Sequence, residues 1–306
     1  MEIDRKRGCI GVKKTSVLAD AGLLLVALIW GMGFSATQYA IGSGLSAAMI
    51  LLLRFSVAAL AMAALCFPQV RGVSAKEFAT GAISGLFLFL GFCFQIEAQS
   101  RTTPSNCAFI TTTNVLMVPF IVWAVSRKKP GIKNILLPAL TVVGIFILGW
   151  APGQGLSFAT GDVLALVCAF FFACHIASLE FTSRRVEARR LTFIQMATAS
   201  LLSLVYFLIA DRSVVTGEML RQGALPVLYL GLLSTCACFF LQTACQKYTS
   251  ATKAAIFLSL EGVFGSLFSV LLGLEPLRWT LLAGGGIIFL SVVLTEVRLP
   301  QRRINA

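Results

Sequence analysis

The sequence has few charged residues and a single histidine. Asp, Glu, Lys and Arg together make up 12% of the 306 residues, whereas apolar residues make up 58%. An average soluble domain has about 25% charged residues, roughly twice as many. A chain so poor in charge is better suited to a lipid bilayer than to water, and we therefore expect an integral membrane protein.

The sequence also lacks the motifs of the common enzyme classes. No HExxH, GxSxG or GxxxxGK[ST] pattern occurs, and no two cysteines have the C-x-x-C spacing. The lone His175 cannot form a metal site by itself, because such a site needs about three or four protein ligands. These absences argue against an enzyme and against ATP hydrolysis. We expect no cofactor and no metal.

What the sequence does contain is ten apolar runs. Most are about 20 residues long, which is the length of helix that spans a hydrocarbon core about 30 Å thick. We therefore predict an all-α protein with ten transmembrane helices. The runs cover approximately residues 18–40, 46–67, 77–99, 105–125, 134–150, 162–182, 191–210, 223–245, 252–274 and 280–297.

Basic residues gather in every second gap between these runs. Of the 25 Lys and Arg residues, 20 fall on one predicted side of the membrane and four on the other, and Arg54 lies inside a run. Loops rich in Lys and Arg stay in the cytoplasm. We therefore expect a multi-pass protein of the cell (inner) membrane with both termini cytoplasmic. Membrane topology and lipid headgroups then account for the net charge of +12, and we expect no nucleic-acid partner.

The two halves of the chain resemble each other. A shift of 147 residues aligns 92–120 with 239–267 without a gap, and a shift of 142 aligns Asp20 with Asp162 at the start of two long runs. Each half contains five predicted helices, so the second copy enters the membrane from the opposite side. Inverted repeats of this kind are common in secondary transporters, with the substrate site between them near the membrane midplane.

We accordingly divide the chain into four parts. Residues 18–150 and 161–297 are the two five-helix repeats, residues 1–17 are a cytoplasmic basic tail, and residues 298–306 are a cytoplasmic C-terminal tail. No loop is long enough to hold a soluble catalytic domain. We therefore expect the function to lie within the helix bundle.

Several short motifs match a known family. They are Trp30-Gly31 followed by Phe34, Arg54-Phe55 with Ala58-Ala59, Gln246-Lys-Tyr-Thr-Ser-Ala251, Leu260-Glu-Gly-Val-Phe264 and Glu275-Pro-Leu277. Together with the ten runs, they make the chain similar to the drug/metabolite transporter superfamily, in particular its EamA-type members, over about residues 18–297. The resemblance implies a secondary transporter, commonly an exporter of amino acids, related metabolites or drugs. It also implies a central cavity lined by the first, third, fourth, sixth, eighth and ninth helices.

Two charged residues lie deep inside predicted helices. Arg54 is the ninth residue of the run 46–67 and Glu261 the tenth of the run 252–274. Such charges cost about 2.5–3.5 kcal/mol on insertion scales and often mark functional sites. We predict that Arg54 binds a substrate carboxylate, for which its fixed charge and planar fork are suited. We predict that Glu261 binds an amine or carries an exchangeable proton as the coupling residue. The alternative is that each residue pairs with another helix and fixes its packing.

Other polar and aromatic residues complete the predicted substrate site. Asn114 aligns with Glu261 in the repeat, so the two halves of the cavity would differ in charge. His175 could move a proton, because imidazole titrates near neutral pH, or could form an interhelical hydrogen bond. The remaining predicted site residues are the repeat-equivalent Gln95 and Gln242 and the aromatic Trp30 and Phe34, with Phe171 and Phe172 as further candidate walls. Helix packing is the alternative role for each of them.

The other acidic residues in or beside the helices are expected to be structural. Asp20 and Asp162 each begin a run, where a carboxylate caps free N–H groups and favours the positive helix end. Two further carboxylates are spaced for i,i+4 ion pairs. The predicted pairs are Glu180 with Arg184 and Glu97 with Arg101.

These features together predict a secondary transporter that exports small metabolites such as amino acids by alternating access through a central cavity. Its expected partners are the lipid bilayer and a small-molecule substrate, either an amino acid, a related metabolite or a drug. The alternatives are a non-transporting receptor or scaffold and an intramembrane enzyme, which the missing motifs disfavour. The sequence leaves open the substrate's identity, the direction of transport, the coupling ion and the oligomeric state.

Overall fold

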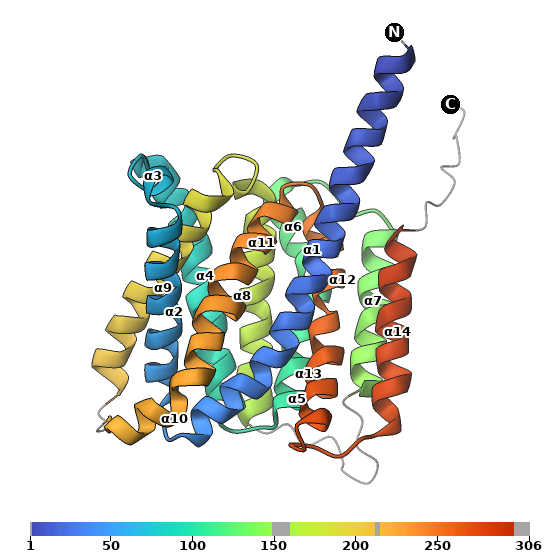
Figure 1. Cartoon of the computed structure of the whole chain (residues 1–306). Helices are drawn as coiled ribbons and strands as arrows, with labels where there is room; N and C mark the ends of the chain where they lie inside the picture. The colour runs from blue at the N-terminus through green and yellow to red at the C-terminus, as the bar shows by residue number, and fades with distance from the viewer. Residues whose placement is uncertain (1, 149–159, 212–214, 297–306) are drawn as a thin grey trace.

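The structure, a computed structural model, describes residues 2–148, 160–211 and 215–296 (Figure 1). Within these ranges the chain is helical and contains no strand. The predicted C-terminal tail, 298–306, lies outside the described residues. The expectation of an all-α protein is confirmed.

The described helices form ten crossings, as predicted. Eight are long and apolar enough to span a bilayer, and two shorter apolar helices complete the set. The first repeat contains α1 (Glu2–Gly42), α2 (Ala47–Leu65) followed by the short α3 (Phe67–Val70), α4 (Ala75–Gln99), the pair α5 (Pro104–Thr112) and α6 (Asn114–Ser126), and α7 (Lys133–Leu148). The second contains α8 (Thr160–Thr182), α9 (Ala188–Ala210), the series α10 (Gly217–Leu228), η1 (Tyr229–Ala237) and α11 (Cys238–Gln246), the pair α12 (Ala251–Leu258) and α13 (Leu260–Leu271), and α14 (Trp279–Glu296).

The two repeats have opposite orientations. In Figure 1, α1 begins at the top and runs downward, whereas α8, the first helix of the second repeat, begins at the bottom and runs upward. Helix α14 ends on the side at which α1 begins. The fold is therefore a pair of inverted five-helix repeats, as the odd number of helices in each half requires.

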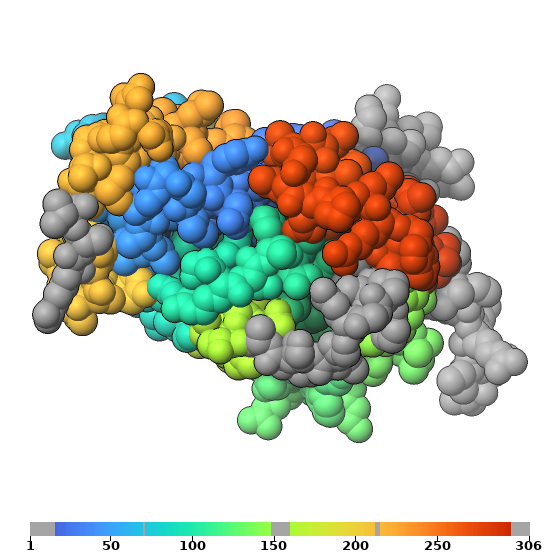
Figure 2. Space-filling model, turned by 90° about the horizontal axis from the view of Figure 1, so that it is seen from below, coloured from blue at the N-terminus to red at the C-terminus, as the bar shows by residue number. Residues whose placement is uncertain are grey.

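Helices of one repeat pack mainly against helices of the other. Helix α4 lies against α8 and α9, α2 against α9 and η1, α1 against α13, and α7 against α14. At the end of the molecule seen in Figure 2, the α4–α5 connection lies beside both the start of α8 and the turn after α13. There the Ser105 N–H donates to Oε1 of Glu275 at 3.2 Å. Most contacts between helices therefore join one repeat to the other.

The first helix is longer than the sequence predicted. The apolar run begins near residue 18, but α1 begins at Glu2, and only Ser16–Gly42 is apolar enough to span a bilayer. Hydropathy marks where a helix meets lipid and does not mark where the helix begins. Asp20 therefore lies inside α1, so the prediction that it caps the helix is wrong. Its carboxylate instead pairs with the Lys253 ammonium at 2.8 Å.

The fourth and ninth crossings are broken, although the sequence predicted continuous helices. The break falls at Thr113 between α5 and α6, and at Ser259 between α12 and α13. Thr113 Oγ1 donates to the Ile110 carbonyl and Ser259 Oγ donates to the Ile256 carbonyl, both at 2.6 Å. Hydroxyls that bond back in this way compete with the regular ladder and bend helices. Both copies of the repeat are therefore interrupted, at positions that differ by one residue in the alignment of the repeats.

The eighth crossing contains a π-helical segment, η1, which the sequence did not predict. It follows Pro226, which has no N–H to donate to the preceding turn. The Tyr229 N–H donates to the carbonyls of both Leu225 and Pro226, at the point where the wider helix begins. Short π-helical segments frequently occur at functional sites. This one brings Ser234 and Thr235 toward the centre of the bundle.

Replacing Gly31 by Ala should destabilise the fold. A Cβ there would lie 2.5 Å from Phe264 Cβ and 2.8 Å from the Gly265 nitrogen, so α1 and α13 would have to separate. Overpacking of this kind costs about 1–3 kcal/mol. Gly286→Ala is the matched control, since no atom lies within 4 Å of a Cβ at that helical position. Thermal unfolding in detergent should show a lower midpoint for Gly31→Ala alone; equal midpoints for the two variants would contradict this packing.

Candidate functional site

A central cavity lies between the two repeats. Its empty volume is about 540 Å³. All eight residues that the sequence singled out for the substrate site line it, although their function remains a prediction. The lining residues are Trp30, Gly33, Phe34, Thr37, Arg54, Phe92, Gln95, Asn114, Phe172, His175, Ile176, Leu230, Ser234, Phe239, Gln242, Leu258 and Glu261.

Most of this lining consists of repeat-equivalent pairs. At the shift of 142 residues, α1 and α8 contribute matching positions, and at the shift of 147 the α4 and α6 positions match those of α11 and α13. The cavity is therefore built twice from the same unit, once in each orientation. The pairs are Trp30 with Phe172, Gly33 with His175, Phe34 with Ile176, Phe92 with Phe239, Gln95 with Gln242, and Asn114 with Glu261.

A repeated hydrogen bond fixes the first helix of each half beside the cavity. Gln99 Nε2 donates to the Phe34 carbonyl at 2.6 Å, and Gln246 Nε2 donates to the Ile176 carbonyl at 3.1 Å. Both glutamines are buried, and both carbonyls belong to residues that line the cavity. The two hydrogen bonds join equivalent positions of the two repeats. They therefore support the internal repeat in addition to the sequence identities.

Arg54 brings a positive charge to the cavity from α2. Only 1% of the residue is exposed, and its Nε donates to Thr235 Oγ1 at 3.1 Å. The guanidinium carbon lies 3.8 Å from the centre of the Phe92 ring. In the described part of the chain no carboxylate forms an ion pair with it. The resemblance implied a cavity lined by six helices, and the second helix was not among them. Arg54 therefore adds α2 to the expected lining.

Glu261 brings a carboxyl group to the cavity from α13 of the second repeat. It is the second residue of α13, directly after the break at Ser259, and is 7% exposed. A carboxylate in the first turn of a helix is favoured by the helix dipole. Within the described ranges, its carboxylate has no hydrogen bond and no ion pair, and it does not pair with Arg54. The repeat-equivalent Asn114 is the first residue of α6, and it also lines the cavity.

His175 is held in one orientation by Gln195. Its Nε2 lies 2.7 Å from Gln195 Oε1, and Gln195 Nε2 donates to the Leu191 carbonyl at 3.2 Å. Because the amide nitrogen is occupied by that carbonyl, the hydrogen of the His175–Gln195 bond is assigned to the imidazole Nε2. A neutral ring then has Nδ1 as its hydrogen-bond acceptor. The interhelical hydrogen bond predicted as one alternative for His175 is therefore present.

Aromatic rings form much of the remaining wall. The repeat-equivalent Phe92 and Phe239 meet edge to face, with ring centres 5.8 Å apart. Trp30 packs on Phe239 at 4.9 Å, and its Nε1 donates to the Ser234 carbonyl in η1 at 2.8 Å. Phe171, by contrast, stacks on Phe94 and does not line the cavity. An amphipathic ligand would therefore meet both aromatic and charged surfaces here.

Several lining residues were missed by the sequence reasoning. Phe92 and Phe239 carried a usable signal, since they are identical at equivalent positions of the repeat. Ser234 and Leu230 carried none, because a regular helix through Pro226 would direct different side chains inward. Thr37 carried no distinct signal, because its neighbours Ser35 and Gln38 are polar as well and many helical threonines bond to their own helix.

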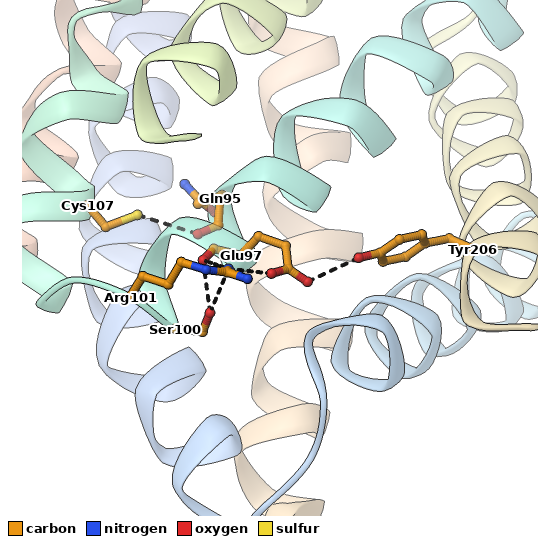
Figure 3. A network of polar contacts seen from close by, with 6 residues as sticks. All are labelled: Gln95, Glu97, Ser100, Arg101, Cys107 and Tyr206. Atoms are coloured by element: carbon orange, nitrogen blue, oxygen red, sulfur yellow. Dashed lines mark hydrogen bonds and ion pairs between the residues drawn. The ribbon is translucent and has the colours of Figure 1, made fainter. Parts of the chain in front are cut away.

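The carboxylates near the helix ends have structural partners. In Figure 3 the Glu97 carboxylate accepts from Arg101 and from the Tyr206 hydroxyl, the latter at 3.0 Å, which confirms the predicted Glu97–Arg101 pair. In the same view, Gln95 contributes its backbone carbonyl, which accepts from Cys107 Sγ at 3.6 Å.

The predicted pairing of Glu180 with Arg184 is wrong. Glu180 Oε2 instead accepts from the Ala251 N–H at 2.8 Å. Ala251 is the first residue of α12, whose free N–H groups need acceptors. Asp162 lies in the first turn of α8, where a cap was expected.

Known proteins share this architecture. The chain matches the EamA-like transporter family over residues 17–150 and 159–297, which is once for each repeat. It belongs to the EamA-like transporter family. The protein is therefore a multi-pass membrane transporter, as its resemblance to this family implied.

Two individual proteins are similar to this EamA-like chain. A protein of Archaeoglobus fulgidus named as an uncharacterized transporter is 33% identical over 296 residues, covering 97% of this chain and 91% of the relative. The crystal structure of another protein has a TM-score of 0.72 at 17% identity and covers 92% of this chain and 96% of its own. At that identity the second likeness concerns the fold alone.

The cavity of this EamA-like protein does not have the composition of a metal centre. Within the described residues, no group of three or more His, Cys, Asp or Glu side chains is placed to hold a metal ion. The charged groups on the wall are Arg54 and Glu261, with His175 as a further titratable group.

Trp30→Phe should lower the stability of this EamA-like protein by about 0.5–1.5 kcal/mol, the usual worth of one hydrogen bond. The variant keeps an aromatic ring against Phe239 but leaves the Ser234 carbonyl of η1 without its donor. Trp123→Phe is the matched control, since Trp123 is 39% exposed at the outer surface of α6. Thermal midpoints in detergent measure both. An equal decrease in the two variants would show that the bond to η1 contributes nothing specific.

Proposed function

We propose that the protein exports small metabolites such as amino acids across the inner membrane by alternating access to the central cavity. The observation that carries this proposal is a pair of buried ionisable side chains on the wall of one cavity, Arg54 and Glu261, neither of which forms an ion pair within the described residues. Buried charges are ordinarily paired. A solute that carries both charges would complete the pairing of each, and it could do so only while bound between the repeats.

The inverted repeats support alternating access. In transporters of this type, two similar halves of opposite orientation rock around a central site and expose it first to one face and then to the other. Here both α5–α6 and α12–α13 break beside the cavity, at Thr113 and Ser259. Broken helices allow the inner and outer halves of a crossing to tilt separately. The distribution of Lys and Arg supports placing both chain ends in the cytoplasm.

Glu261 is the proposed coupling group. Its carboxylate has no partner within the described residues, and its repeat equivalent is the neutral Asn114. Ionised, it would attract a substrate ammonium group; protonated, it would carry a proton through the cavity. Either role requires a group that exchanges its partner in each cycle. A carboxylate already bonded within the protein, such as Glu97, would not serve.

Glu261→Gln should lower transport by about tenfold or more, because an interaction with a buried charge is worth about 1.5–3 kcal/mol. Any remaining transport should respond less to pH, since the amide does not titrate and His175 is then the titratable group left on the cavity wall. Uptake and counterflow of a panel of amino acids into proteoliposomes, across a pH series, measure both effects.

Glu187→Gln is the control variant, because its carboxylate is 51% exposed and lies at the start of α9 away from the cavity. It should transport as the unchanged protein does. If Glu261→Gln folds and transports normally at every pH, Glu261 is neither the coupling group nor a substrate ligand.

A further inference from the structure

Arg54 is the most deeply buried charged side chain in the cavity wall. Its residue is 1% exposed, compared with 7% for Glu261. A guanidinium keeps its positive charge under all ordinary conditions. A charge removed from water is costly unless an opposite charge or several hydrogen bonds compensate it. Within the described ranges, Arg54 has one side-chain hydrogen bond, from Nε, and no ion pair.

The residues around the Arg54 guanidinium hold it in place but accept only one of its hydrogen bonds. Thr235 accepts from Nε on one edge of the group, and the Phe92 ring covers one face at 3.8 Å. These two contacts fix the plane of the fork and leave the terminal Nη1 and Nη2 without hydrogen bonds to described residues. Neither atom is fully covered by protein, and Arg54 lines the cavity. The free edge of the guanidinium therefore faces the cavity.

We propose that this free edge is a carboxylate-binding subsite, so that the transported solutes carry a carboxylate group. The inference rests on the proposed transport function and names the chemical class of its substrate. Two parallel N–H donors match the two oxygens of a carboxylate, and such bidentate contacts are among the strongest hydrogen bonds in proteins. A carboxylate at this position supplies both the missing charge and the missing acceptors.

The proposal gives Thr235 and Phe92 a role as positioning residues. They do not bind the carboxylate but hold the guanidinium in one plane, so little side-chain freedom is lost when the ligand arrives. Thr235 lies in η1, and the π-helical turn after Pro226 therefore contributes to the subsite. Phe92 belongs to α4 of the other repeat. The subsite is thus assembled by both halves of the molecule.

Acetate tests the subsite directly on the purified protein. A ligand that binds the folded state raises the thermal midpoint. We expect the midpoint to rise with acetate, measured at constant ionic strength against a bulky sulfonate anion that does not fit the cavity. Arg54→Gln should abolish this rise, and Arg54→Lys should retain a smaller one, because an ammonium lacks the bidentate fork. Arg71→Gln, at the exposed turn after α3, should retain all of it.

Two acetate results would overturn the proposal. One is an unchanged protein whose midpoint does not respond to acetate. The other is an Arg54→Gln variant that responds as the unchanged protein does. If Arg54→Gln fails to fold, the comparison of acetate with acetamide on the unchanged protein decides the point, since only the charged ligand should stabilise it.

The positioning role has a separate readout. Thr235→Val removes the acceptor of the Nε hydrogen and should weaken the apparent acetate affinity about two- to tenfold, the range expected for one hydrogen bond. Thr235→Ser should restore it, because the hydroxyl is kept. Equal affinities in Thr235→Val and the unchanged protein would show that Thr235 does not position the guanidinium.

Transport measurements distinguish this proposal from the broader one. Carboxylate-bearing amino acids should compete for uptake, and their carboxamides should compete at least about tenfold less well, as expected for loss of a charged hydrogen-bonded contact. Equal competition by acids and amides overturns the carboxylate subsite. If no solute is transported, but acetate still stabilises the unchanged protein and not Arg54→Gln, then the transport proposal fails and the subsite stands.

Discussion

In a bilayer, a polar group without a hydrogen-bonding partner is costly, and this cost constrains the whole fold. Hydrocarbon offers no hydrogen bonds, so irregular backbone and charged side chains are tolerated there only inside protein or beside a water-filled space. The breaks at Thr113 and Ser259, the π-helix η1, and the charges of Arg54 and Glu261 all gather around one cavity. The location of the site follows from that constraint before any substrate is considered.

The inverted repeat gives the cavity two equivalent walls. The residues that differ between the repeats give it its ionisable groups. Matching phenylalanines and glutamines, such as Phe92 with Phe239, line both halves. The pairing of Asn114 with Glu261 breaks this symmetry, and so does Arg54, which comes from α2. One half of the pocket therefore differs from the other in charge. That asymmetry would orient a zwitterionic solute, whereas a symmetric cavity would not.

The sequence predicted the ten crossings and eight residues that line the cavity for the same reason. Ionisable residues are so rare in the middle of apolar runs that Arg54, His175 and Glu261 are evident without a structure. Local bonding was harder to predict. In the sequence, a threonine at a helix break cannot be distinguished from a threonine within a regular helix. The break at Thr113 was therefore not predicted. Glu180 was assigned to the wrong partner, because the Ala251 N–H that it binds is 71 positions away in the chain and sequence spacing favours neighbours.

Alternating access requires one cavity between the repeats to open in turn to each face of the membrane. Ser234 lines that cavity from η1 and reports on it most directly. In a chain whose nine cysteines have been replaced, Ser234→Cys should react with a small membrane-impermeant thiol reagent applied to right-side-out vesicles and, separately, to inside-out vesicles. Alternating access predicts reaction from both faces. Reaction from one face only, under all substrate gradients, would contradict it.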